Sequence, residues 1–462
     1  MAGRHGGIGD PRRLGLSGRL AMTTRCDVVV VGAGLAGLSA AREMSIHGAN
    51  VCVLEAADCV GGRVRSDVVD GFIFDRGFQL YNPAYPEAAR VLDHEALDLR
   101  PLARGVDVVR ADGVGPRAKR SVVHLGDPRS PRAWHISALS RKAGTVASKA
   151  RFARYALAAA RSRGSQIDVR PDEPAQVALA RAGMDATLID EVIKPFLTGV
   201  FLEPHLMTSR RFMDVVLASF VKGTPSLPAG GMQAVPDQLH AALPEGTVRL
   251  STTVTSVAAD HVESSAGRFD AKVVIVATDA AGAAELLPGE TIETEGNSVT
   301  TWYHAVPVDS LQEPLTRGRS MLTVPATNQG PVINTVPLTY AVPSYSPADY
   351  VLVSTSALGV HTSPDGVAVE TELAVREQLA TLYAADTRAW ELLAAYPIEY
   401  ALPSMRPPRR VSHAIEQGEV IIAGDHTTTA SIQGAMVSGR RAGDLALDRL
   451  GIDRPFERRV VA

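Results

Sequence analysis

Cysteine is scarce in this chain of 462 residues. The three cysteines are Cys26, Cys52 and Cys59, an odd number confined to the first 59 residues. This distribution argues against a disulfide framework and favours a reducing cytoplasm as the location. Cys26 and Cys52 fall on two expected neighbouring strands, where a thiol acts as a small hydrophobic side chain.

The sequence also lacks long apolar runs, clusters of metal-binding residues and a strong net charge of either sign. No apolar run approaches the roughly 18 residues that a helix needs to span a membrane. The net charge of −3 gives no general attraction to nucleic acid. The 12 histidines are scattered and pair with no cysteine, so no metal site is predicted. No G-x-S-x-G or comparable nucleophile context occurs.

A strand–turn–helix–strand pattern near the N-terminus is the most informative feature that is present. The valines at residues 28–31 are typical of a strand buried on both faces. Gly32 allows a tight turn, Gly34 lets a pyrophosphate approach the backbone, and Gly37 lets the helix pack close to the strand. Glu55, 21 positions after Gly34, ends the second strand and can accept hydrogen bonds from both hydroxyls of a ribose. The pattern therefore predicts a dinucleotide-binding unit.

Two glycine-containing segments follow this unit closely. Gly61, Gly62 and Arg63 put flexible backbone and a fixed cation beside the expected pyrophosphate. Residues 75–80 then place Gly77 between polar side chains. The position of the first segment, six residues after the second strand, favours a contact with a cofactor over a surface turn.

The C-terminal region carries a second polar loop after a short apolar strand. Residues 420–423 are typical of a buried strand, and they run directly into Gly424 and Asp425. A helix is expected to begin near Gln433, with small residues that would let a ligand approach free N–H groups. A plain nicotinamide enzyme would not need this second site so far along the chain.

These motifs resemble those of the flavin-dependent amine oxidase superfamily, which includes protoporphyrinogen oxidase and phytoene-desaturase-like enzymes. The resemblance covers nearly the whole chain after residue 25 and includes a Gly-Gly turn at residues 230–231. It implies FAD as the cofactor. The cofactor-binding residues that it implies are Gly32, Gly34, Leu35, Ala36, Gly37, Glu55, Ala56, Gly61, Gly62, Arg63, Gly77, Phe78, Gln79, Val254, Gly424, Asp425, Gln433, Gly434 and Ala435.

The resemblance also implies individual roles. Glu55 would hold the adenosine ribose, and Val254 would meet the adenine through its backbone. Arg63 would lie near the flavin, and Asp425 would bind the ribityl–phosphate linker. The helix dipole at Gly434 would face the pyrimidine edge of the flavin and stabilise negative charge on the reduced ring.

A chain of this length is expected to form two or three domains. The resemblance implies an α/β fold, in which a Rossmann-like FAD-binding domain is interleaved with an α+β substrate domain made of a mixed sheet and helices. The FAD-binding domain is expected to contain residues 25–90, 226–290 and 410–450. The substrate domain is expected to contain residues 91–225 and 291–409. Residues 1–24 are expected to form a disordered N-terminal extension.

Local patterns give further expectations. They predict helices over residues 168–222, interrupted at Lys194-Pro195, one strand over 247–257, an antiparallel sheet over 298–356 and a helix over 367–395. Residues 137–165 contain seven basic and no acidic side chains. A basic amphipathic helix there would allow peripheral contact with an anionic membrane, and the alternative is a solvated helix face.

Two departures from the superfamily pattern narrow the function. No cysteine lies beyond Cys59, so cysteinyl attachment of FAD near the C-terminus is excluded and a non-covalent cofactor is expected. Residues 430–433 lack the tyrosine that amine oxidases place there as one wall of an aromatic cage, and only 5% of the chain is aromatic. These features favour an apolar or carbon-rich substrate over a simple amine.

The sequence therefore predicts a cytoplasmic FAD-dependent oxidoreductase that oxidises or desaturates a small apolar or amphipathic molecule by hydride transfer to flavin N5. One alternative is an oxygen-dependent amine oxidase. Another is a protein that binds prenylated partners without a flavin, like GDP-dissociation inhibitors. Lys194 and His304 are weak candidates for a catalytic acid or base, and a surface lysine and a hydrogen-bonded sheet histidine are the favoured explanations of them. The sequence identifies no electron acceptor and no oligomeric state.

Overall fold

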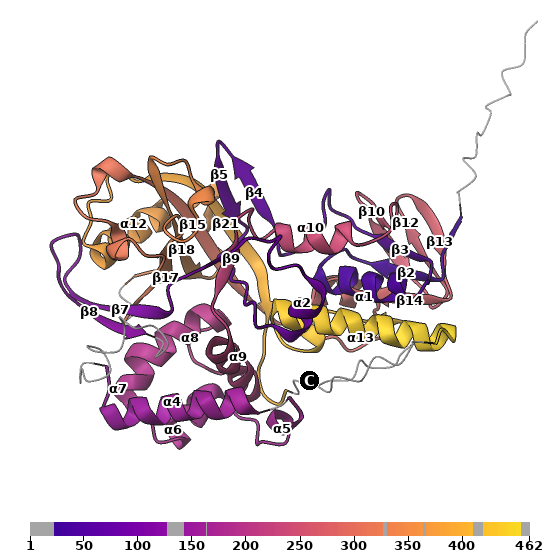
Figure 1. Cartoon of the computed structure of the whole chain (residues 1–462), viewed down its shortest axis with the longest axis horizontal. Helices are drawn as coiled ribbons and strands as arrows, with labels where there is room; N and C mark the ends of the chain where they lie inside the picture. The colour runs from indigo at the N-terminus through magenta and orange to yellow at the C-terminus, as the bar shows by residue number, and fades with distance from the viewer. Residues whose placement is uncertain are drawn as a thin grey trace, which may run out of the picture.

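The chain folds into two lobes (Figure 1). One lobe holds helices α1 (Leu35–Ile46) and α13 (Ile432–Leu450) beside a parallel sheet, and the other holds a second sheet with a block of helices. The computed structural model describes residues 23–126, 143–162, 164–326, 330–363, 366–409 and 419–453. Residues 1–22 of the predicted extension therefore lie outside the described residues, and its last residue, Thr24, belongs to β1 (Thr24–Arg25).

The parallel sheet joins strands from the beginning, middle and end of the chain. Its described strands, in spatial order, are β10 (Val248–Arg249), β3 (Val51–Leu54), β2 (Val28–Val31), β14 (Val273–Val276) and β22 (Ile421–Ile422). All neighbouring pairs run parallel, and every residue of the three central strands is buried. Such a position explains their near-continuous valine content. The predicted α/β fold class is confirmed.

A smaller sheet corrects one predicted strand. It contains β1, β13 (Gly267–Asp270), β12 (His261–Ser264) and β11 (Val254–Val257). The single strand predicted over residues 247–257 is in fact β10 and β11, which belong to different sheets. Ser251, between them, has a left-handed backbone conformation with φ of 52°, so the chain turns there instead of staying extended.

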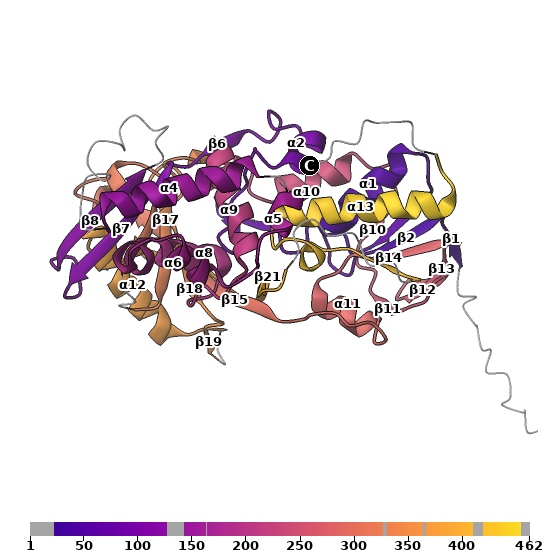
Figure 2. The same cartoon turned by 90° about the horizontal axis from the view of Figure 1, so that it is seen from below.

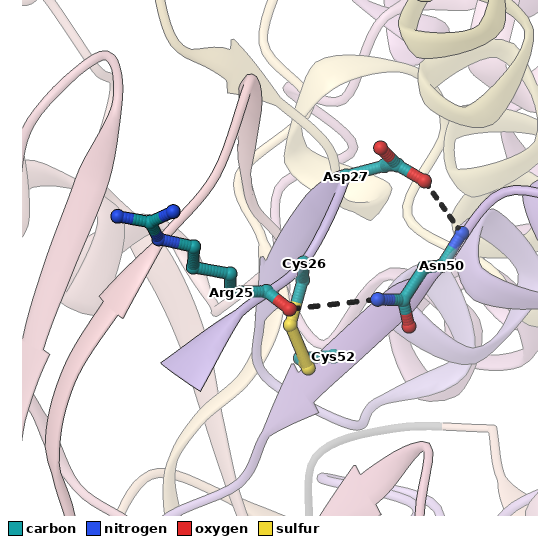
Figure 3. The surroundings of a disulfide bond; sticks show 5 residues. All are labelled: Arg25, Cys26, Asp27, Asn50 and Cys52. Atoms are coloured by element: carbon teal, nitrogen blue, oxygen red, sulfur yellow. Dashed lines mark hydrogen bonds between the residues drawn. A yellow bond between two sulfur atoms is a disulfide. The ribbon is translucent and has the colours of Figure 1, made fainter. Parts of the chain in front are cut away.

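The cysteines differ from the prediction, because Cys26 and Cys52 form a disulfide (Figure 3). Cys26 lies just before β2 and Cys52 lies in the neighbouring β3, which brings their Cα atoms to 6.2 Å, within disulfide range. The side chain of Asp27 accepts a hydrogen bond from the backbone of Asn50 at 3.0 Å and ties the same two chain segments together. Cys59 is a free thiol. The odd number of cysteines gave no indication of this disulfide, because the pairing of neighbouring strands is what brings Cys26 and Cys52 together.

The second sheet is mixed. Its described strands, in spatial order, are β21 (Glu391–Pro403), β15 (Gly296–Pro307), β18 (Tyr350–Leu358), β17 (Val332–Pro337), β16 (Leu322–Pro325), β7 (Gly105–Asp112) and β8 (Lys119–Gly126). The β16–β7 pair is parallel and the other pairs are antiparallel. Residues 298–356 thus form antiparallel pairs as predicted, and the parallel partner comes from earlier in the chain.

The helix predicted over residues 367–395 is shorter than expected. Helix α12 (Val369–Tyr383) ends where Ala384 adopts a left-handed conformation with φ of 50°. The chain then forms β21, which pairs along most of β15. The pattern over residues 391–395 is compatible with both structures, and pairing with β15 decides in favour of a strand.

Alternation along β15 gives the second sheet two different faces. Tyr303 packs in the core cluster that includes the parallel-sheet lobe, whereas Trp302 packs in a cluster with α12. Because side chains alternate along a strand, Thr301 shares the face of Tyr303, and His304 shares the face of Trp302. One face of the sheet therefore points toward the lobe of the parallel sheet, and the other points toward α12. Because the first lobe carries the predicted dinucleotide-binding turn, it is called the nucleotide lobe below.

The helical block lies beside the second sheet (Figures 1 and 2). It contains α4 (Val146–Arg161), α5 (Gly164–Asp168), α6 (Ala175–Arg181), α7 (Ala186–Leu188), a π-helix (Ile189–Ile193), α8 (Lys194–Phe201) and α9 (Arg210–Lys222). The predicted interruption at Lys194-Pro195 is absent from this described segment. The π-helix runs directly into α8, and Pro195 lies in the first turn of α8.

Shorter elements complete the description. They are α2 (Pro86–Val91), α10 (Ala234–Ala241), α11 (Ala280–Leu286), β4 (Ser66–Val69), β5 (Phe72–Asp75), β6 (Leu99–Pro101), β9 (Ser226–Pro228), β19 (Thr362–Ser363), β20 (Gly366–Val367), and 3-10 turns at Val308–Ser310, Leu315–Arg317, Pro343–Tyr345 and Asp425–Thr427. Among the helices of the described ranges, none is long and apolar enough to cross a bilayer.

Helices α1 and α13 are in backbone contact, and glycine makes this possible. A Cβ built on Gly439 would lie 2.0 Å from the carbonyl oxygen of Ala36. A Cβ on Gly443 would lie 3.0 Å from the carbonyl oxygen of Ala40. Close packing of this kind leaves no room for a side chain. The contact holds the start of α13 near the turn that precedes α1.

A buried carboxyl group connects the two lobes. Asp75, the last residue of β5, accepts hydrogen bonds on Oδ1 from Ser66 Oγ at 2.6 Å and from the Met232 backbone at 2.9 Å. Its Oδ2 accepts one from the Tyr345 hydroxyl at 2.9 Å, and its backbone carbonyl accepts one from the Tyr303 hydroxyl at 2.7 Å. Burial raises the pKa of Asp75 to about 6, although the three side-chain acceptor bonds act in the opposite direction.

Replacing Gly439 by alanine tests the helix contact. The new methyl group would meet the Ala36 carbonyl, so Gly439→Ala should lower the free energy of unfolding by roughly 1–3 kcal/mol. This outcome is opposite to the roughly 1 kcal/mol that helix propensity alone would add. Urea denaturation measures the change. Gly289→Ala is the control, because a Cβ at this exposed position meets nothing within 4 Å. Equal stability of the two variants would contradict the contact.

The pH dependence of stability tests Asp75. Its folded pKa of about 6 lies above the unfolded value of 3.8, so its contribution is complete below 3.8 and is lost as the pH rises through about 6. Asp75→Asn resembles the neutral acid, because it keeps one acceptor oxygen and can donate to Tyr345. Wild type should therefore lose up to about 3 kcal/mol more than the variant as the pH rises. Urea unfolding at several pH values measures the difference, and identical pH profiles would refute the assignment.

Candidate functional site

The turn between β2 and α1 brings the predicted glycines together. Gly32 has φ of 99°, which favours glycine, and a Cβ on Gly37 would lie 1.9 Å from the Gly32 carbonyl oxygen. Gly34 caps α1, whose first residues are Leu35 and Ala36, without any side-chain cap bond, and a Cβ built on Gly34 meets nothing within 4 Å. The helix thus begins with uncapped N–H groups beside open space, an arrangement that suits a phosphate.

Glu55 lies against the same turn. It follows the last residue of β3, its Oε2 accepts a hydrogen bond from the Ala33 backbone at 2.6 Å, and its Oε1 accepts one from the Ala57 backbone at 2.9 Å. Ala56 lies between Glu55 and Ala57 in the sequence. Val254 begins β11 in the small sheet. The contacts of Glu55 with ribose and of Val254 with adenine stay predictions.

The second glycine pair lies directly beside the turn. The backbone of Gly61 donates to the Ala33 carbonyl at 2.9 Å, and Gly61 forms a β-bridge with Gly34. A Cβ on Gly62 would lie 3.5 Å from the Cα atom of Gly34. Both glycines have positive φ, 117° for Gly61 and 61° for Gly62. Two segments that the sequence marked separately therefore form one glycine-lined surface.

Arg63 joins this surface to the C-terminal loop. Its guanidinium donates to the Asp425 carboxylate at 2.6 Å and to the Ala401 carbonyl at 3.0 Å, and it lies 5.4 Å from the ring centre of Tyr400. Burial acts to lower the pKa of Arg63, but the charge of Asp425 and the hydrogen bond to it outweigh burial and raise it. The arginine therefore stays charged where residues more than 300 positions apart in the sequence meet.

The segment after β5 completes the contact with the second sheet. The Gln79 side chain donates to the Arg63 carbonyl at 2.7 Å. The Phe78 backbone donates to Thr301 Oγ1 on β15 at 3.4 Å. A Cβ on Gly77 would lie 2.7 Å from Ile398 Cδ1 on β21, so a larger residue there would push against that strand.

The start of α13 satisfies part of its backbone N–H groups within the protein, and the predicted contact of this helix start with a cofactor stays a prediction. The sequence suggested that Gly434 leaves free N–H groups open to a ligand, but its N–H donates to Ser431 Oγ at 3.0 Å. A Cβ on Gly434 would lie 2.0 Å from the Thr429 carbonyl oxygen, so the loop itself requires the glycine. The Ala435 N–H donates to the Ser431 carbonyl, and Gln433 Oε1 accepts a bond from the α2 backbone at 3.0 Å.

Buried polar atoms beside Arg63 lack partners within the described part of the chain. They are the Tyr400 hydroxyl and both ring nitrogens of His426. Burial lowers the pKa of His426, although Asp425 opposes this, so the imidazole is neutral. Unpaired buried polar atoms beside an open glycine turn are what a protein leaves for a bound polar molecule. The cluster therefore fits a nucleotide cofactor.

The two candidate acid–base residues lie elsewhere. His304 faces α12, where its Nε2 lies 3.1 Å from Glu372 Oε1, and burial lowers its pKa although Glu372 opposes this. Glu372 in turn accepts bonds from Arg376. His304 is thus on the opposite sheet face from Thr301. Lys194 is the first residue of α8, and its side chain makes no hydrogen bond with any other residue that the structure describes.

Sequence reasoning missed Tyr400 and Ala401. Residues 391–395 were expected to be helical, so β21 was not recognised as a strand whose alternate residues reach the nucleotide lobe. The apolar–polar alternation over residues 396–400 is the signal that could have indicated it. No group of three or more potential metal ligands occurs in the described ranges.

Comparison with known proteins identifies relatives over short segments. The chain is 49% identical to putrescine oxidase of Kocuria rosea over 72 residues, which are 16% of this chain and 15% of that protein. It is 46% identical to protoporphyrinogen oxidase 2 of Arabidopsis thaliana over 66 residues, which are 14% of this chain and 13% of that protein. These alignments span only a small part of each relative.

Similarity of the fold and of the family pattern covers most of the chain. The structure of cyclohexylamine oxidase from Brevibacterium oxydans matches with a TM-score of 0.66 at 15% identity, covering 92% of this chain and 99% of that chain. At this identity the likeness concerns the fold alone. The pattern of the flavin containing amine oxidoreductases matches residues 35–447. The chain therefore belongs to the flavin-containing amine oxidoreductase family.

Proposed function

We propose that this chain is an FAD-dependent oxidoreductase that oxidises or desaturates a small apolar or amphipathic molecule. The observation that supports this most directly is the contact of Arg63 with Asp425, which joins the glycine turns to the C-terminal loop. Family membership supplies the cofactor class. The unpaired polar atoms of Tyr400 and His426 give the cluster spare hydrogen-bonding capacity for that cofactor.

Each part of the cluster then has a task. The N–H groups after Gly34 would bind the pyrophosphate, and Glu55 would bind the ribose. Arg63 and Asp425 would hold the linker and flavin region in one orientation. When bound, FAD supplies a two-electron acceptor for hydride. The face of the second sheet that carries Tyr303 would exclude water from the reacting C–H bond.

A preference for an uncharged substrate over an amine is part of the proposal. A cage for an ammonium group needs exposed aromatic faces. The face of Tyr400 is already covered by the Arg63 guanidinium, which lies 5.4 Å from the ring centre. An oxygen-dependent amine oxidase is nevertheless the second candidate function, because the family and several relatives include amine oxidases.

A membrane contact through α4 is also a proposal. Arg151, Arg154 and Arg161 are exposed, and so is Leu157 at 45%. An anionic membrane would attract such a face. Arg151 also donates to the Gly183 carbonyl at 3.0 Å, which equally suits a solvated helix face, and the remaining basic residues of segment 137–165 lie partly outside the described residues.

The absorption of the purified protein tests the cofactor, and anaerobic mixing tests the substrate. We expect a flavin band in the visible region that survives gel filtration and leaves the protein on denaturation, because no cysteine near the C-terminus can attach it. Uncharged amphipathic compounds should bleach this band faster than simple amines of equal size. A colourless protein that cannot be reconstituted with FAD would overturn the function, and peroxide release with amines alone would favour the second candidate.

Glu55→Ala tests the ribose contact. Loss of charged hydrogen bonds should weaken FAD retention by about ten- to a hundredfold while the protein stays folded. Flavin fluorescence released on dilution measures retention, and circular dichroism checks the fold. Glu290→Ala, which removes an exposed acid of the same lobe, is the control and should retain FAD like wild type. Unchanged retention in Glu55→Ala would show that the ribose assignment is wrong.

A further inference from the structure

Three uncharged polar side chains form a row on the face of the second sheet that points toward the nucleotide lobe. They are Thr301 on β15, Ser356 on β18 and Asn334 on β17, and we call them the polar row. Strand register places Thr301 opposite Ser356, and Ser356 opposite Asn334. The Thr301 and Ser356 hydroxyls are 3.2 Å apart. All three residues are buried, with at most 4% of their surface exposed.

One end of the polar row adjoins the cofactor cluster. Thr301 Oγ1 accepts the N–H of Phe78, and the neighbouring Gln79 donates to the Arg63 carbonyl. Two hydrogen bonds thus connect the row to the arginine that joins the glycine turns to the C-terminal loop. A molecule that contacts the row would therefore lie near the proposed flavin region.

The other end of the polar row carries an unused amide. Within the part of the chain that the structure describes, no residue hydrogen-bonds the Asn334 side chain, although it is only 4% exposed. A Cβ built on Gly199 of α8 would lie 2.6 Å from Asn334 Nδ2, so glycine leaves the space that the amide occupies. Because no described residue pairs with this amide, a ligand that hydrogen-bonds it would gain an interaction without breaking one within the protein.

The groups that hydrogen-bond the polar row are uncharged. Tyr396 on β21 lies opposite Thr301, and its hydroxyl is committed to Asp67. Asp67 itself is paired with Arg76 at 2.9 Å. Among the described residues, no acid or base hydrogen-bonds Asn334 or Ser356. An ammonium group placed here would lose its hydration without gaining a carboxylate partner.

We propose that the polar row binds an uncharged oxygen-bearing group, a carbonyl or a hydroxyl, of an otherwise apolar substrate. Asn334 offers N–H donors to a carbonyl and an acceptor oxygen to a hydroxyl, and Ser356 can do either. The row would thereby orient the substrate relative to the cofactor cluster. This inference rests on the proposed function and specifies the substrate class of that site.

Titration of the FAD-loaded protein with two probes of one shape tests the proposal. Cyclohexanone carries a carbonyl, and cyclohexylamine carries an ammonium group near neutral pH. The change in the flavin absorption spectrum reports binding without turnover. We expect wild type to bind cyclohexanone more tightly. Asn334→Leu should weaken cyclohexanone binding about tenfold and leave cyclohexylamine binding unchanged.

Two further variants change the Asn334 amide in other ways, and a third serves as a control. Gly199→Ala forces the Asn334 amide to move and should cause a similar loss for cyclohexanone. Asn334→Asp should shift the preference toward cyclohexylamine, because a carboxylate can pair with its charge. Thr355→Val is the matched control: its side chain lies on the opposite face of β18, where it contacts Thr335, so probe binding should not change.

The outcomes separate this inference from the proposed function. A protein that retains no FAD refutes the proposed function. A protein that retains FAD but prefers cyclohexylamine, or binds neither probe, refutes the polar row as the recognition site. The polar row is also refuted if Asn334→Leu and Gly199→Ala, both folded and flavin-loaded, bind cyclohexanone as tightly as wild type does.

Discussion

The ion pair between Arg63 and Asp425 is the interaction on which the site depends. The Asp425 side chain is only 7% exposed, whereas that of Arg63 is 33% exposed, so the loss of Arg63 would leave the Asp425 carboxylate buried without compensation. Arg63 also binds the Ala401 carbonyl of β21 and lies against Tyr400. A single side chain thus fixes the glycine turns, the C-terminal loop and the second sheet relative to one another. Three contacts on one rigid, planar group give the preorganisation that positions a cofactor.

Close backbone packing makes this ion pair possible. Gly439 lets α13 touch α1 at Ala36, and Gly37 lets α1 touch the turn before it. The start of α13 and the N-terminal turn are therefore held at a fixed distance before any side chain contributes. Asp75 acts in the same way between the lobes, because its hydrogen bonds to Tyr345 and Tyr303 secure the segment that leads to Phe78 and Gln79.

Local features of the site could be predicted from the sequence, and long-range ones could not. The Gly32–Gly37 turn, the adjacent Glu55 and the helix after Ser431 follow from spacing and residue type, since a turn or a cap is decided within a few residues. The Cys26–Cys52 bond and the place of β21 depend on strand register, which no local pattern specifies. Composition likewise indicates that Gly434 needs space around it, but it does not indicate that the Thr429 carbonyl lies there.

The electrostatics of the second sheet bear on how a substrate would be chosen. Charged side chains near the site form ion pairs with one another: Arg63 pairs with Asp425, and Arg76 pairs with Asp67. The polar row presents hydroxyl and amide chemistry to the nucleotide lobe, and of its three side chains Asn334 alone has its full hydrogen-bonding capacity unspent within the described structure. A site of this kind discriminates by the penalty of leaving a buried polar group unpaired, not by charge attraction. A neutral oxygen-bearing molecule therefore enters such a surface at a smaller desolvation penalty than a cation does.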